Sequence, residues 1–329
     1  MEEVLPGIYQ LPLPHISQGH VNTYLIREGT EYLLVDTGWN TDESFDLLKN
    51  QMAEIGIDFR DISQIVITHI HPDHYGLAGR LRQLSQAKIA MHHLEKDHIN
   101  SRYTDMRELL QQMEQWLHAS GVSTDELPKI QTASVAVAKF VSPVPPDITL
   151  YGDETLFNGF SNFKVLWTPG HSPGHICLYE PTRKVLISGD TVLPTITTNV
   201  GLHPQSSNNP LGDYLNSLNT LKQLDVNLAL PGHENPFTDL YSRIDTLARH
   251  HKQRNSEIRA TIKTGPKTVY RISTEVTWMP KKGGISWQNL NPLDKRLAIL
   301  ETLAHLESMR ADGDVEKISK DGIIYYQSS

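Results

Sequence analysis

A short run of histidine and aspartate side chains constrains this 329-residue chain more than any other feature. It lies between Thr68 and His74 and reads Thr-His-Ile-His-Pro-Asp-His. The residues before it, from Ile62 onward, are mostly apolar and β-branched, which predicts a buried strand. Pro72 removes a backbone donor and restricts the preceding residue, so we expect a stiff loop. The run therefore predicts four metal-ligand side chains just past the end of a strand: His69, His71, Asp73 and His74.

Three further apolar segments end at a glycine-flanked histidine or aspartate. They stop at Thr-Pro-Gly-His171, at Ser-Gly-Asp190 and at Pro-Gly-His233. A closed zinc site takes four ligands, so this larger set predicts two metal ions. Neutral imidazole and carboxylate groups suit Zn²⁺, with Mn²⁺ or Fe²⁺ as alternatives. Histidines outside these loops are interpreted as ordinary surface or packing residues; examples are His15, His92, His93, His118, His250, His251 and His305.

The order of these motifs resembles the metallo-β-lactamase superfamily, in particular its glyoxalase II-like hydrolases. The resemblance covers about residues 4–237. It implies an α/β fold, a four-layer αββα sandwich, with a dinuclear metal centre at one edge. It also implies a first metal held by His69, His71 and His171, a second held by Asp73, His74 and His233, and a bridging Asp190. His175, the second histidine of its loop, is expected behind the ligands or at the start of the next strand.

The same resemblance implies a metal-dependent hydrolase that uses a hydroxide bridged by two metals, with Asp73 and Asp190 as catalytic residues. The bond that it cleaves stays open among ester, thioester, lactone and phosphoester. A glutathione thioesterase is less favoured, because Val192-Leu-Pro follows the bridging aspartate where that group has Leu-Phe and glycines. A lactonase is less favoured because Leu193 stands where those enzymes have tyrosine. Asp36, in an Asp-Thr-Gly element, is expected to support the metal loop by hydrogen bonds and not to bind metal.

We predict two domains, a catalytic domain at residues 1–237 and a small, mainly helical one at residues 238–329. A helical insert at about residues 95–147 carries apolar side chains at helical spacing. This stripe is expected either to line the substrate pocket as a cap or to pack on the sandwich or on a second subunit. The polar loop at residues 191–209 is expected to border the pocket, because loops of this length are usually functional. Residues 148–157, 163–167, 176–179 and 184–187 are predicted to be strands of the second sheet.

Three helices and a hairpin turning at Asp321-Gly322 are predicted for residues 238–329. This pattern is similar to the winged-helix-like tail of some superfamily members. It raises an alternative function, a nucleic-acid-binding or ribonuclease-type protein that acts through this tail. The basic residues of the tail are scattered among acidic ones, so packing or dimerisation is favoured over nucleic-acid binding.

Composition and the chain start bear on location and partners. A single cysteine, Cys177, excludes an internal disulfide framework. The first residues have no basic and apolar leader pattern, and the chain has no run of 18 apolar residues. The formal net charge is −8. The sequence predicts a cytoplasmic protein that acts on a small molecule and has no membrane partner. A homodimer is an open alternative.

Overall fold

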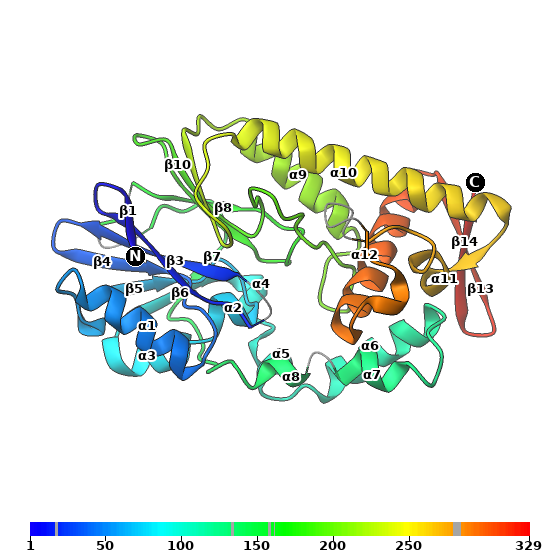
Figure 1. Ribbon diagram of the computed structural model, residues 1–329, viewed down its shortest axis with the longest axis horizontal. Helices are drawn as coiled ribbons and strands as arrows, with labels where there is room; N and C mark the ends of the chain where they lie inside the picture. Colours follow the sequence, from blue (N-terminus) through cyan, green and yellow to red (C-terminus); the bar gives the residue numbers. More distant parts are fainter. Residues whose placement is uncertain (17–18, 133–134, 157–158, 161, 279–283) are drawn as a thin grey trace.

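The computed structural model describes residues 1–329 except 17–18, 133–134, 157–158, 161 and 279–283. Its first sheet has seven strands that lie side by side in chain order (Figure 1). The first four are antiparallel neighbours, and the pairs from the fourth strand onward are parallel. The strands are β1 (Glu2–Leu5), β2 (Ile8–Pro14), β3 (His20–Glu28), β4 (Glu31–Val35), β5 (Ile62–Val66), β6 (Lys88–His92) and β7 (Ile148–Leu150).

A second sheet has four strands in the order β11-β10-β9-β8. The pair β10 and β11 is parallel, and the other two pairs are antiparallel. A third, small sheet near the C-terminus has the order β12-β14-β13. The bounds are β8 (Lys164–Trp167), β9 (Ile176–Glu180), β10 (Val185–Gly189), β11 (Leu228–Pro231), β12 (Lys267–Thr268), β13 (Val315–Lys320) and β14 (Ile323–Ser328).

The two larger sheets pack face to face between helices. Successive strand residues point to opposite faces, and on β4 the buried Leu33 and Val35 belong to the core between the sheets, whereas Leu34 faces the outer helices. On β10, Leu186 lies in the opposite outer core. The helices over the first sheet are α1 (Asp42–Ala53) and α3 (Ala78–Ser85), and those over the second are α9 (Pro210–Leu221) and α10 (Leu240–Thr261). The predicted αββα sandwich is confirmed.

The insert is helical, as predicted, and lies below the C-terminal helices in Figure 1. Its helices are α4 (His93–Lys96), α5 (Ile99–Tyr103), α6 (Arg107–Ala119), α7 (Leu127–Thr132) and α8 (Val135–Ala138). The remaining helices are α2 (Pro72–Tyr75), α11 (Val269–Ser273) and α12 (Pro292–Ala311). Short 3₁₀ turns span Phe59–Asp61, Ile262–Thr264 and Trp287–Asn289.

The C-terminal segment forms the predicted three helices and hairpin, and Asp321 and Gly322 both have positive φ at the turn. Its core is continuous with the outer face of the second sheet, because Leu186, Leu247 and Leu306 belong to one cluster of buried side chains. The domain boundary at residues 237/238 stays a prediction. Among the described residues, each helix is too short or too polar to cross a lipid bilayer.

Two strand predictions were wrong. Residues 148–157 were assigned to the second sheet, but β7 pairs with β6 in the first sheet, with Ala90 opposite Ile148; Phe157 lies outside the described residues. A run of apolar residues does not indicate which sheet a strand joins. The apolar residues from Val4 to Leu13, interrupted by prolines, predict a single edge strand from the sequence, but the structure has a hairpin of β1 and β2 there. Pro12 and Pro14 are tolerated in β2 because β1 reaches only as far as Gln10, so neither proline faces that neighbour.

Helix α3 contains a glycine where no side chain fits. A Cβ atom on Gly79 would lie 2.5 Å from the carbonyl oxygen of Ser142. Alanine in a helix interior is better than glycine by about 1 kcal/mol, but overpacking costs about 1–3 kcal/mol. We therefore predict that Gly79→Ala lowers the free energy of unfolding, measured by urea denaturation.

The exposed Gln83 of the same helix provides the matched control. Gln83→Ala should leave the free energy of unfolding unchanged within about 0.5 kcal/mol. A Gly79→Ala protein more stable than the wild type would contradict the close approach of α3 to Ser142.

Candidate metal centre

Four loops at one edge of the sandwich bring the predicted ligands together. They follow β5, β8, β10 and β11. The potential ligand atoms form three overlapping groups, and within each group they lie within 4.8 Å of one another. The groups are His69, His71 and His171; Asp73, His74 and His233; and His69, His74 and Asp190.

Asp190 lies between the two outer groups. Its Oδ1 atom is 3.4 Å from Nε2 of His74, and its Oδ2 atom is 3.4 Å from Nε2 of His233 and 3.7 Å from Nε2 of His171. This placement fits a carboxylate shared by two ions. That the seven side chains bind metal stays a prediction, but all seven lie where it requires them.

Polar atoms that lack a hydrogen-bond partner test whether this cluster fits a metal. Among the described residues, Nε2 of His74, Nε2 of His171 and Oδ1 of Asp190 are buried without any such partner. A buried polar atom without a partner costs about 1–3 kcal/mol. All three face the cluster, and each can offer a lone pair to a cation, the two imidazoles in their neutral form. The residues present therefore fit divalent metal ions.

The buried carboxylate of Asp36 holds the first ligand loop. Its Oδ2 atom accepts hydrogen bonds from Nδ1 of His74 and from the hydroxyl of Thr68, both at 2.8 Å. Its Oδ1 atom accepts the backbone N–H of Thr68 at 2.8 Å. Asp36 has a φ of 61°, in the left-handed region, which aspartate tolerates better than most residues. The predicted supporting role of Asp36 is confirmed.

The other ligands are oriented by backbone carbonyls. Nδ1 of His171 donates to the carbonyl of Asn199 at 2.8 Å, and Nδ1 of His233 donates to that of His20 at 3.0 Å. These bonds turn Nε2 of each ring toward the cluster, and they place the remaining proton on Nδ1 when the ring is in its neutral, metal-binding form. His175 lies behind the cluster, as expected, where its Nε2 accepts the backbone N–H of Asp190 at 3.0 Å just before β9 begins.

Burial and charge divide the histidines into two classes. Burial, together with neighbouring imidazoles, lowers the pKa of His69 and of His71 well below the usual range, so both are neutral, as metal ligands must be. Burial also opposes a charge on His74 and His233, but the carboxylates of Asp190 and Asp73 outweigh it. They raise the pKa of His74 to about 10 and that of His233 to about 12.

Sequence reasoning missed three residues that surround the ligands. Glu95 is fully buried and accepts the backbone N–H of Ile70 at 3.0 Å and the hydroxyl of Ser172 at 2.8 Å, so it joins two ligand loops. Nε2 of His15 lies 3.4 Å from Oδ2 of Asp73, so its interpretation as an ordinary packing residue was wrong. The hydroxyl of Tyr103 donates to the carbonyl of Ile70 at 2.5 Å. None of the three lies in a recognisable motif, and they meet the site only through folding.

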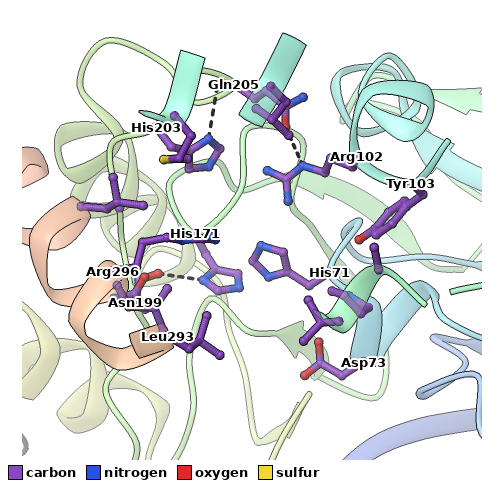
Figure 2. A pocket seen from close by; sticks show the side chains of 18 of the residues that line it. His71, Asp73, Arg102, Tyr103, His171, Asn199, His203, Gln205, Leu293 and Arg296 are labelled. Atoms are coloured by element: carbon purple, nitrogen blue, oxygen red, sulfur yellow. Dashed lines mark hydrogen bonds between the residues drawn. The ribbon is translucent and has the colours of Figure 1, made fainter. Parts of the chain in front are cut away.

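A cavity of about 410 Å³ opens beside the cluster and includes His71, Asp73, His171 and Asp190 in its wall (Figure 2). The insert lines it, as the cap hypothesis predicted, through side chains that include Met106 of the turn before α6 and Leu109, Leu110 and Met113 of α6. Met113 also lies in the core, so the packing alternative holds for part of the stripe. The loop at residues 191–209 borders the cavity, as expected. The contribution of α12 was not predicted; its cavity residues are Leu293, Arg296, Leu297 and Leu300.

Comparisons with known proteins agree with this geometry. The model of the metallo-β-lactamase superfamily matches residues 16–233. The probable metallo-hydrolase YqjP of Bacillus subtilis is 24% identical over 325 residues, 97% of this chain and 96% of that protein. The acyl-coenzyme A thioesterase MBLAC2 of Homo sapiens is 27% identical over 232 residues, 67% of this chain and 75% of that protein. The crystal structure of the metallo-β-lactamase family protein TTHA1429 from Thermus thermophilus superposes with a TM-score of 0.82 at 31% identity and covers 99% of this chain and 100% of that one.

The Asp36 hydrogen bonds should matter for metal affinity. Asp36→Ala removes the acceptor that orients His74, and loss of such a supporting partner typically lowers metal affinity about 10- to 100-fold. We expect this loss for zinc in competition with a chromophoric chelator. The exposed Asp46→Ala is the control and should bind zinc as the wild type does. Equal affinities of the Asp36 variant and the wild type would contradict the supporting role.

Metal uptake should release protons. Because the pKa values of His74 and His233 are raised to about 10 and about 12, both rings are in the doubly protonated, positively charged form in the metal-free protein at pH 7.5. Metal binding needs both neutral, so zinc should displace about two protons, and its affinity should rise with pH. An indicator dye in weakly buffered solution measures the release. Zinc binding without any proton release would contradict the prediction that these two rings are protonated in the metal-free protein and become ligands.

Proposed function

The chain belongs to the metallo-β-lactamase superfamily, and from this membership and the geometry of its site we propose that it is a hydrolase that uses two divalent metal ions, with zinc expected first, to cleave an acyl bond. A thioester is the favoured bond. The observation that carries the proposal is the convergence of seven potential ligands, of which His74, His171 and Asp190 each have a buried atom without a hydrogen-bond partner among the described residues.

The side chains of this protein would position the metal ions and the attacking water. Two divalent ions, when bound, would lower the pKa of a water molecule to about 7 and stabilise negative charge on the substrate. His69, His71 and His171 would hold one ion, Asp73, His74 and His233 the other, and Asp190 both. Asp36 fixes the ring of His74. The carboxylate of Asp73 would accept a hydrogen bond from the attacking water and so hold it in line with the substrate carbonyl.

An apolar cavity wall favours an acyl substrate over a phosphodiester. Met106, Leu109 and Leu110 on one side and Leu293 and Leu297 on the other provide surface for a hydrocarbon chain and exclude water from the reacting carbonyl. Human MBLAC2 is described as an acyl-coenzyme A thioesterase, and its similarity to this chain covers 67% of this chain. We infer that the substrate of this chain is a thioester or a related activated acyl compound.

A cytoplasmic location stays a prediction. A homodimer stays an open alternative, as does the less favoured nucleic-acid-binding role of the C-terminal segment. Helix α12 contributes side chains to the cavity, which supports a role for this helix at the substrate pocket and not in nucleic-acid binding.

Removal of one ligand carboxylate tests the proposed function. Asp73→Ala removes a predicted metal ligand that also orients the attacking water, and we expect turnover to fall about 100- to 10,000-fold. The measurement is hydrolysis by zinc- or manganese-loaded protein of a thioester, a lactone, a β-lactam, an aryl phosphodiester and RNA. The circular dichroism spectrum of the variant should match that of the wild type.

The exposed Asp153→Ala is the control and should keep full activity. Activity on the thioester that depends on metal and on Asp73 would support the proposal. Metal-dependent activity on RNA alone would favour the ribonuclease alternative. Near-normal turnover of the Asp73→Ala protein would contradict the role of Asp73.

A further inference from the structure

Two arginines face the cavity beside the metal cluster from opposite walls. Arg102 comes from α5 of the insert and Arg296 from α12 near the C-terminus. Figure 2 shows Arg102 entering the cavity on one side and Arg296 on the other, with His71 and His171 beside them. Neither arginine belongs to the four ligand motifs, and the proposed hydrolytic mechanism uses neither of them.

Arg102 is held in place by one nitrogen. Its Nε donates to Oε1 of Gln205 at 2.7 Å, and Nε2 of Gln205 donates in turn to the hydroxyl of Ser101 at 2.8 Å. Within the described part of the chain, the two terminal nitrogens of Arg102 make no hydrogen bond. This arrangement fixes the plane of the guanidinium group and leaves its outer edge available, which is the geometry that carboxylate and phosphate groups bind.

Arg296 is more unusual, because its Nε atom is buried and has no hydrogen-bond partner among the described residues. The same part of the chain offers it no carboxylate within ion-pair distance. Burial and the positive charge of Arg102 lower the pKa of Arg296 to about 10. The guanidinium group therefore stays charged at neutral pH but is destabilised by its surroundings.

A buried positive charge is normally paired. Here two positive charges share a cavity whose own carboxylates, Asp73 and Asp190, are already engaged with histidines of the metal cluster. Burial lowers the pKa of His71 and of His203, and the charge of Arg102 adds to this effect. An anion between the two arginines would remove the repulsion and satisfy the unpaired nitrogens.

We propose that Arg102 and Arg296 form an anion-binding subsite, which holds a carboxylate or phosphate group of the substrate while its acyl carbon lies at the metal cluster. This inference rests on the proposed function and narrows it to anionic acyl substrates. The apolar side chains between the arginines and the cluster, such as Met106 and Leu297, would contact the hydrocarbon part of such a molecule.

Three phenyl thioesters with acyl chains of similar length test the subsite. One is derived from hexanoic acid and is neutral, one from adipic acid and ends in a carboxylate, and one ends in a phosphonate. The proteins are the zinc-loaded wild type, Arg102→Gln, Arg296→Gln and the control Arg107→Gln, whose exposed side chain pairs with Asp105 in the same insert.

The wild type should have a higher kcat/KM for one of the charged thioesters than for the neutral one. Either subsite variant should reduce kcat/KM for that charged thioester about 10- to 100-fold, because a hydrogen-bonded charge is lost. The same variants should stay within about twofold of the wild type on the hexanoyl thioester. The preferred charged substrate distinguishes a carboxylate from a phosphate. Equal losses on neutral and charged substrates, or a wild type that prefers neither charged thioester, would overturn the inference.

A binding measurement separates this inference from the proposed function. Calorimetric titration of the metal-depleted wild type with adipate and with inorganic phosphate needs no hydrolysis. Binding of either anion that Arg296→Gln abolishes and Arg107→Gln retains supports the subsite even where no thioester is cleaved. Binding that is absent, or unchanged in Arg296→Gln, would overturn it.

Discussion

The predicted metal cluster depends on the hydrogen bonds that the buried carboxylate of Asp36 accepts. This carboxylate accepts three hydrogen bonds from Thr68 and His74, and Asp36 sits at the end of β4 in a left-handed conformation. Through these bonds the end of one strand fixes the loop that follows its parallel neighbour β5. Glu95 also connects two loops through its carboxylate, because its hydrogen bonds join Ile70 to the loop of His171. Two buried carboxylates outside the predicted ligand set thus position the predicted metal ligands, which is a common way of tuning metal sites.

The cavity shows why the remaining parts of the chain are needed. The sandwich supplies the cluster, but the insert and α12 supply most of the apolar wall. Because the C-terminal helices share a buried core with the outer face of the second sheet, α12 is held firmly against the site. The same packing brings Arg296 opposite Arg102, two residues far apart in sequence. In the proposed function, substrate selection would therefore depend on the segments outside the ligand motifs, whereas the chemistry would depend on the motifs.

Sequence patterns predicted the parts of the site that are local. The strand before Thr68, the four ligand loops and the role of Asp36 could be read from short motifs, because each is a strand end followed by a few defined residues. Glu95, His15 and Arg296 could not, because their roles arise from contacts between segments that no spacing rule connects. The assignment of residues 148–157 to the second sheet failed for the same reason, since an apolar run predicts a strand but not its neighbour. The tail was predicted from its three helices and hairpin, but its place against the cavity was not.

In the proposed function, seven side chains from four loops hold two metal ions. The most direct measurement is anomalous X-ray diffraction at the zinc edge from crystals of the zinc-loaded protein. Two anomalous peaks are expected, one among His69, His71 and His171 and one among Asp73, His74 and His233, with Asp190 between them. A single peak, or peaks away from these residues in fully loaded crystals, would contradict this arrangement.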